Sequence, residues 1–388
     1  MNYIVISPYY PQNFQQFTIE LANKGITVLG IGQEPYEQLD EPLRNSLTEY
    51  FRVENLENLD EVKRAVAFLF YKHGPIDRIE SHNEYWLELD AALREQFNVF
   101  GAKPKDLKKT KFKSEMKKLF KKAGVPVVPG AVVKAEKDID KAVKKIGLPL
   151  IAKPDNGVGA AATFKIETPE DVDHFKAEWD GHTEYFFEKF VTSSEICTFD
   201  GLVDRDGNIV FSTTFDYAYT PLDLMLYKMD NSYYVLKEMD PKLRQYGEAI
   251  VKAFGMKERF FHIEFFRDGD DYIAIEYNNR PAGGFTIDVY NYAHSIDLYR
   301  GYAAIVAGEP FPASEFEPLY CLATSRRANA AYVLSEEEVL AKYHDQFRVK
   351  KDMPAAFAEL QGDYLYMLTT PSREEFEQMI HDFGQRQS

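Results

Sequence analysis

The sequence predicts a multidomain protein of mixed α/β and α+β class, and three observations support this. The chain has 388 residues, more than one compact domain usually contains. Strand-like and helix-like segments alternate through the first hundred residues, as in a parallel sheet flanked by helices. Further along, Asp206-Gly207 and Asp268-Gly269 mark hairpin turns between extended segments. We expect domains at residues 1–102, 103–309 and 310–388.

Residues 1–102 are expected to form a Rossmann-like domain. The segments YIVIS, ITVLGIG and IDRIESH are typical of strands, and helical segments separate them. No GxGxxG fingerprint follows the first strand, which argues against NAD binding. His82 and Glu84 lie at the end of the strand at 76–82, at the edge where α/β sheets bind ligands, so they are substrate candidates.

Residues 103–309 are expected to form the largest domain, with a small lobe at about 115–190. The segment 103–124 contains ten lysines on a helical pattern that ends at Gly124, and most of them are expected to face solvent. Helix–strand pairs, the two hairpins and a helix that stops at Gly308 follow. Residues 310–388 begin with a linker that contains prolines and continue as a small α/β unit.

Composition excludes several classes of function. The formal charge of −16 argues against nucleic acid as a partner, because phosphate neutralisation needs surplus Lys and Arg. Cys197 and Cys321 are the only cysteines, so there is no disulfide framework, and a reducing cytoplasm is expected. No apolar run is long enough to span a membrane. The oligomeric state cannot be read from the sequence, and a homodimer is one alternative.

The second hairpin carries two carboxylates in apolar surroundings, in FHIEFF and IAIEYNNRPAGG. If the two strands keep matching parity, Glu264 and Glu276 are cross-strand neighbours, with Asn278 on the same face. Two bare carboxylates about 4 Å apart repel by about 4 kcal/mol at a dielectric of 20. A divalent cation removes this repulsion, and such ligands suit nucleotide-bound Mg²⁺. The alternative is a pair of exposed acids.

Two further segments carry weaker signals, one for phosphate contacts and one for a junction between two lobes. In IAKPDNGVGAAATFKI, a strand delivers Lys153 to a loop containing Gly157 and Gly159, whose backbone amides could approach phosphate oxygens. In FFEKFVTSSEI, an apolar strand continues to Glu188 and ends at polar residues. This segment would connect two lobes. Taken alone, the first segment could be a simple turn and the second a simple strand end.

Together and in this order, these segments resemble the ATP-grasp superfamily, in particular its carboxylate–amine ligases, a group that is similar to biotin carboxylase and carbamoyl-phosphate synthase. The resemblance implies a Rossmann-like domain, a two-lobed ATP-grasp domain and a small C-terminal α/β domain. It also implies ATP and Mg²⁺ as cofactors, with Mn²⁺ as an alternative ion. The implied metal ligands are Glu264, Glu276 and Asn278.

The resemblance assigns the remaining nucleotide contacts residue by residue. Lys111 and Lys153 contact phosphates, beneath the loop of Gly157 and Gly159. The adenine is held by Glu188 and by the backbone of Phe190 and Val191, and the ribose by Glu195. Arg280 matches an arginine that acts on the phosphoryl group or the substrate, and Lys228 lies where relatives carry a catalytic lysine near the phosphates.

Candidates for binding the organic substrate are less firmly indicated. Gly283 and Gly284 would let a substrate approach the backbone. His262 shares the face of Glu264, and a structural histidine is the alternative there. Arg326 and Arg327 could hold a carboxylate bidentately, or form surface salt bridges.

The implied activity is ATP-dependent ligation of a small-molecule carboxylate to an amine, such as an amino acid, through an acyl phosphate. A purine-pathway ligase is the nearest alternative. A phosphotransferase of the same fold and a nucleotide-binding regulator without turnover are alternatives of other classes.

Overall fold

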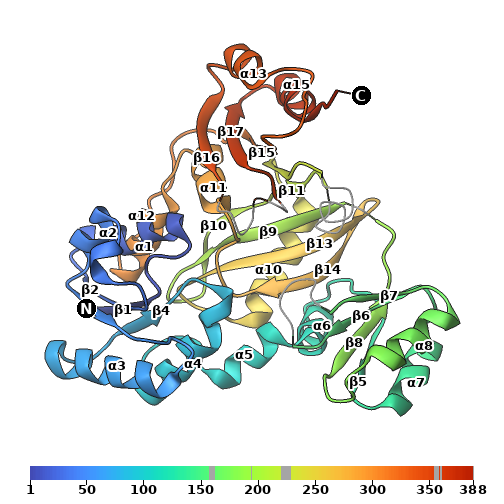
Figure 1. The fold of residues 1–388 in the computed structure, drawn as a ribbon, viewed down its shortest axis with the longest axis horizontal. Coiled ribbons are helices and arrows are strands. Elements are labelled where there is room, and N and C mark those ends of the chain that lie inside the picture. Colours follow the sequence, from blue (N-terminus) through green and yellow to red (C-terminus); the bar gives the residue numbers. More distant parts are fainter. Residues whose placement is uncertain (157–161, 194, 220–228, 354–357, 359–360, 388) are drawn as a thin grey trace.

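The computed structural model describes residues 1–156, 162–193, 195–219, 229–353, 358 and 361–387. It contains three sheets, which Figure 1 shows as the N-terminal part in blue, the small lobe in green and the central sheet between them. The C-terminal segment, in red, extends from the central sheet. In the described part of the chain, no helix is both long enough and apolar enough to cross a membrane.

The N-terminal sheet is entirely parallel, in the order β3-β2-β1-β4, as the strand–helix alternation predicted. Its strand interiors are apolar on both faces, as expected where helices cover a parallel sheet. The strands are β1 (Asn2–Ile6), β2 (Thr27–Gly32), β3 (Glu49–Arg52) and β4 (Arg78–Glu80), and the helices are α1 (Gln15–Asn23), α2 (Glu41–Ser46), α3 (Leu59–His73) and α4 (Leu87–Gln96).

The lysine-rich segment forms two helices rather than one. These are α5 (Pro104–Lys111) and α6 (Lys113–Lys122). Phe112, between them, has extended backbone angles and forms an isolated β-bridge with Asn156. The backbone amide of Lys113 also donates a hydrogen bond to Asp155 O, over 2.9 Å. The break therefore fastens the start of α6 to the end of the strand that carries Lys153.

The small lobe is an antiparallel sheet covered by two helices. Its order is β5-β8-β6-β7. The strands are β5 (Gly130–Val133), β6 (Leu150–Pro154), β7 (Phe164–Ile166) and β8 (Tyr185–Lys189), and the helices are α7 (Glu136–Ile146) and α8 (Pro169–Glu178). The buried core of this lobe consists only of residues from its own sheet and helices.

The central sheet has nine strands and reaches into the C-terminal segment. Its order is β14-β13-β9-β11-β12-β15-β17-β16, with β10 also paired to β9. The strands are β9 (Ile196–Val203), β10 (Ile209–Thr213), β11 (Asp216–Tyr217), β12 (Ser232–Val235), β13 (Arg259–Asp268), β14 (Asp271–Asn278), β15 (Tyr320–Arg326), β16 (Phe347–Asp352) and β17 (Tyr364–Thr370). The remaining long helices are α10 (Pro241–Phe254), α11 (Thr286–His294), α12 (Leu298–Val306), α13 (Glu336–Lys342) and α15 (Arg373–Gly384).

One apolar core joins the N-terminal sheet to the central sheet. It includes Tyr3 and Phe17 from the N-terminal part, Phe260 from β13 and Tyr302 from α12. Within it, the hydroxyl groups of Tyr3 and Tyr302 lie 2.8 Å apart. The boundaries expected at residues 102 and 309 stay predictions, while this shared core fixes the two sheets relative to each other.

Candidate active site

The acidic pair of the second hairpin lies at the centre of the site. Glu264 on β13 and Glu276 on β14 are direct cross-strand partners, which confirms the predicted register. Residues two apart on a strand share a face, so Asn278 lies on the face of Glu276. His262, opposite Asn278, lies on the same face as Glu264. Two acids and an amide are thus presented together on one face of the sheet.

The two carboxyl groups have opposite pKa shifts. Burial, together with the charge of Glu264, raises the pKa of Glu276 above its ordinary value. Burial acts in the same direction on Glu264, but His262, Arg280 and Lys153 outweigh it and lower that pKa. A bound cation would relieve the cost of keeping Glu276 ionised beside Glu264. The oxygen donors therefore fit Mg²⁺.

This metal site is not complete from protein side chains alone. Across the described residues there is no group of three or more His, Cys, Asp or Glu side chains that could hold a metal ion. Two carboxylates and an amide leave several of the ligand positions of Mg²⁺ to water and phosphate oxygens, which is how Mg²⁺ is usually held with a nucleotide.

Lysines from two elements face this acidic pair. Lys113, the first residue of α6, has its Nζ 3.8 Å from Glu276 Oε1. Lys153 on β6 adds its positive charge near both Glu264 and Glu276. Lys111, in contrast, forms an ion pair of 2.8 Å with Glu88 on α4. The structure thus brings Lys113 and Lys153 to the acids, and Lys111 to the N-terminal part.

A buried charge network connects Lys153 to the segment between the lobes. Glu188 on β8 accepts a hydrogen bond of 2.9 Å from Lys153 Nζ, and Lys117 Nζ lies 3.2 Å from its other oxygen. Burial opposes ionisation of Glu188, but the ammonium groups of Lys117 and Lys153 lower its pKa to about 2. Lys117 also donates to the backbone oxygen of Ala274 on β14, over 2.9 Å. Lys117 therefore connects the small lobe to the central sheet at this point.

The other predicted nucleotide contacts lie at the end of this network. The amide of Phe190 donates to Pro149 O over 3.2 Å, and Val191 follows it, half-buried. Glu195 is exposed, and its carboxylate lies 3.5 Å from Arg267 Nε. Gly157, Gly159 and Lys228 lie outside the described residues.

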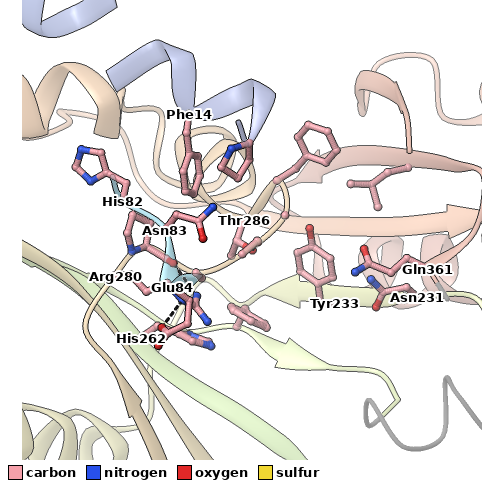
Figure 2. A pocket seen from close by; sticks show the side chains of 18 of the residues that line it. Phe14, His82, Asn83, Glu84, Asn231, Tyr233, His262, Arg280, Thr286 and Gln361 are labelled. Atoms are coloured by element: carbon pink, nitrogen blue, oxygen red, sulfur yellow. Dashed lines mark hydrogen bonds and ion pairs between the residues drawn. The ribbon is translucent and has the colours of Figure 1, made fainter. Parts of the chain in front are cut away.

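A cavity of about 650 Å³ opens beside Glu264, and Figure 2 shows side chains that line it. Arg280 lies in its wall, where its Nε donates to Glu84 Oε2 over 3.0 Å. His262, Gly283 and Gly284 also line it. Gly284 has a φ of +63°, which favours glycine, and its carbonyl accepts a hydrogen bond from Asn13.

Residues from three distant parts of the chain form the wall of this cavity. The N-terminal part provides Phe14 and Glu84, the central sheet provides Tyr233, and the C-terminal segment provides Gln361 and Leu365. His82 lines the cavity too, but its ring stacks on Phe17 and burial lowers its pKa to about 4, so it is a neutral part of the core.

His262 is held by a network that the sequence did not reveal. Its Nδ1 lies 2.7 Å from Asp200 on β9, and its Nε2 lies 3.4 Å from Glu264. Asp200 also accepts hydrogen bonds from the hydroxyl groups of Thr198 and Tyr290. Although burial opposes charge, the two carboxylates raise the pKa of His262 to about 9. An imidazolium therefore borders the cavity.

The two arginines proposed for the C-terminal segment lie elsewhere. The guanidinium of Arg326 is buried and donates to the backbone oxygens of Phe383, Leu334 and Asp382. Arg327 contacts the backbone oxygens of Met229 and Ala358. Neither is among the described residues that line the cavity. The structure therefore does not bring either arginine to Glu264 and Arg280.

Sequence reasoning missed Lys113, Lys117 and Asp200. The two lysines belong to a run of ten, where only the break at Phe112 distinguishes Lys113 from its neighbours. The role of Asp200 could not be predicted, because nothing near a single acid within an apolar strand indicates which distant side chains it contacts.

The chain is similar to known proteins both in sequence and in fold. The chain is 26% identical over 258 residues to an L-arginine-specific L-amino acid ligase of Bacillus subtilis. The aligned residues make up 62% of this chain and 62% of that ligase. The fold is similar to an L-amino acid ligase from Bacillus licheniformis (TM-score 0.70, 15% identity, 98% and 97% of the two chains covered).

Phosphoribosylglycinamide synthetase from Anaerococcus prevotii has a similar fold too, with a TM-score of 0.70, 13% identity, and 98% and 97% of the two chains covered. At these identities the two structures show the fold alone. Residues 146–288 match the ATP-grasp domain family. The chain therefore contains an ATP-grasp domain, as its motifs predicted, within a fold that it shares along nearly its whole length with these two enzymes.

Proposed function

We propose that this protein is an ATP- and Mg²⁺-dependent carboxylate–amine ligase. The observation that carries the proposal is the Glu264–Glu276 pair, which has Lys113 and Lys153 near it and borders, through Glu264, the cavity that Arg280 lines. Phosphate-binding groups and an organic cavity thus meet at one acidic pair. This arrangement suits transfer of a phosphoryl group from ATP to a substrate held in the cavity.

The proposed reaction has two steps. A carboxylate oxygen of the substrate attacks the γ-phosphorus of ATP, ADP leaves, and an acyl phosphate forms. The nitrogen of an amine then attacks the carbonyl carbon and phosphate leaves, so that a C–N bond replaces the C–O bond to phosphate. Such chemistry depends on positioning and on electrostatic stabilisation of the transferring group.

Side chains of this chain would take distinct roles. Glu264, Glu276 and Asn278 would hold Mg²⁺, which supplies neutralisation of phosphate charge when bound. Lys113 and Lys153 would bind phosphate oxygens. Arg280, released from Glu84, would orient the substrate carboxylate, since a guanidinium matches a carboxylate bidentately. Lys111 and Lys228 stay predictions from the resemblance.

The proposal of an amino acid as a substrate is supported by the pairing of Arg280 with Glu84 in the cavity wall. A zwitterion can replace both halves of this pair, with its carboxylate on Arg280 and its ammonium group on Glu84. The L-amino acid ligases among the similar proteins agree with this choice.

The test is to incubate the purified chain with ATP, Mg²⁺ and pooled amino acids, and to follow ADP and phosphate separately. Release of both products only when two substrates are present supports ligation. ADP without free phosphate indicates a phosphotransferase, and no release with any mixture indicates a non-catalytic nucleotide-binding protein. Either of these outcomes would overturn the proposal.

A further inference from the structure

The charges in the wall of the cavity are confined to one end. Among the lining residues that the structure describes, the side chains that carry charge are Glu84, His262, Glu264 and Arg280. Arg280 pairs with Glu84, and His262 pairs with Glu264. The positive charge of Arg280 also lowers the pKa of Glu264. Figure 2 shows Arg280, Glu84 and His262 grouped together. The charged groups therefore form one local network.

The opposite end is neutral and largely aromatic. In Figure 2, Tyr233, Asn231 and Gln361 lie apart from the charged group. Phe215 connects the two ends, because its ring stacks 6.0 Å from that of His262 and lies 5.5 Å from that of Tyr233. Leu365 is buried in the same wall. This end provides apolar surface with a few neutral hydrogen-bonding groups.

The size of the cavity leaves room beyond the charged end. A volume of about 650 Å³ lies within the range of about 300–1,000 Å³ that small-molecule pockets span. A substrate whose carboxylate lies at Arg280, beside Glu264, has room to extend its remaining atoms along Phe215 towards Tyr233. The described side chains that line this end are neutral, so a charged substrate side chain buried against them would have no direct ion-pair partner in the lining, which is unfavourable.

We propose that the carboxylate substrate is an α-amino acid with a neutral side chain, aliphatic or aromatic, which packs against the cavity wall formed by Phe215 and Tyr233. The proposal rests on the proposed ligase function and deepens it. Among the described lining residues, no acid lies at the distal end to pair directly with a guanidinium. Asn231 and Gln361 occupy that end instead.

The experiment traps the acyl phosphate with hydroxylamine, so that it identifies the activated carboxylate whatever the natural amine is. Hydroxylamine nitrogen attacks the acyl carbon, phosphate leaves, and the hydroxamate is measured together with ADP. The full chain is supplied with ATP, Mg²⁺ and one amino acid at a time. We expect leucine, methionine and phenylalanine to exceed arginine, lysine and glutamate in kcat/KM by about tenfold or more, as selection by apolar contacts allows.

Two substitutions test the distal end directly. Asn231→Asp and Gln361→Glu each add a carboxylate at nearly constant volume, and either should raise the use of arginine relative to leucine by about tenfold. Gln96→Glu, on the exposed end of α4, makes the same chemical change outside the cavity and should leave the ratio unchanged.

The outcomes separate this inference from the proposed function. Hydroxamate formed from arginine, lysine or glutamate as efficiently as from leucine would overturn the inference and leave the ligase function standing. An unchanged ratio in both acidic variants, with melting temperatures like that of the parent chain, would also overturn it. No hydroxamate and no ADP release with any carboxylate would overturn both.

Discussion

At the scale of single residues, the site depends on a few groups whose protonation and position are set by burial. Glu264 and Glu276 could be predicted to meet, because a hairpin with period-two strands fixes which side chains face each other. Lys113 could not be predicted, because the helical spacing of the lysine-rich segment continues through Phe112, where the chain breaks to bridge Asn156. That break is a tertiary interaction, which local pattern does not encode.

The acidic pair gives the first prediction. Glu276→Gln should lower ADP release by at least about 100-fold, because a neutral amide no longer balances the metal charge. The melting temperature should stay the same or rise, since repulsion with Glu264 disappears. Glu178→Gln, at the exposed end of α8, is the control. Wild-type turnover by the Glu276 variant would refute the metal assignment.

The two neighbouring lysines give the second prediction. Lys113→Met should reduce kcat/KM for ATP by about 100-fold, as expected for a cation that stabilises the transferring phosphoryl group. Lys111→Met should cost about threefold or less, because Lys111 pairs with Glu88 and a partly exposed ion pair contributes little. Steady-state ADP release measures both. A larger loss in the Lys111 variant would favour the assignment made from the resemblance.

At the scale of elements, the meeting of β4 and β13 determines where the cavity lies. Glu80 on β4 accepts hydrogen bonds from both terminal nitrogens of Arg259, at 2.6 and 2.9 Å, and Arg78 pairs with Glu258. This connection holds the loop that carries Glu84 against the end of β14, where Arg280 follows. The sequence indicated the strands but not these contacts, because ion pairs between residues about 180 positions apart leave no local signal.

This connection gives the third prediction. Arg259→Met should lower the free energy of unfolding by about 3 kcal/mol, because it leaves Glu80 buried with Arg94 as its remaining ion-pair partner. Adding Glu80→Gln should restore part of the loss, as a double-mutant cycle in urea would measure. Arg64→Met, exposed on α3, is the control. Additive losses in the cycle would show that the pair does not couple β4 to β13.

At the scale of the whole molecule, the C-terminal strands are part of the central sheet. The sequence predicted a small α/β unit after residue 309, and the fold class is as predicted. The pairing of β15 with β12 was not indicated, because pairing between strands far apart in the chain depends on which edge is open. As a result, Leu365 and Gln361 reach the same cavity as Phe14.

The proposed binding of Mg²⁺ and nucleotide at the acidic pair gives the fourth prediction. A nonhydrolysable ATP analogue with Mg²⁺ at 100 times its Kd should stabilise the fold by about 2.7 kcal/mol. The increase in melting temperature should disappear largely with EDTA, because the acidic pair repels phosphates without the ion. The Glu276→Gln variant should lack the Mg²⁺-dependent part. An equal increase with and without EDTA would contradict a metal-bridged nucleotide.

The self-contained core of the small lobe has one more consequence. Since its buried apolar cluster contains only side chains of its own sheet and helices, we expect a rotation of the lobe about its connections to leave that cluster intact. Such a rotation relative to α6 would break mainly polar contacts, which are the ion pair of Lys117 with Glu188, the bridge of Phe112 with Asn156 and the hydrogen bonds of Ser114 to Asp155. Nucleotide binding would therefore be expected to change these same contacts.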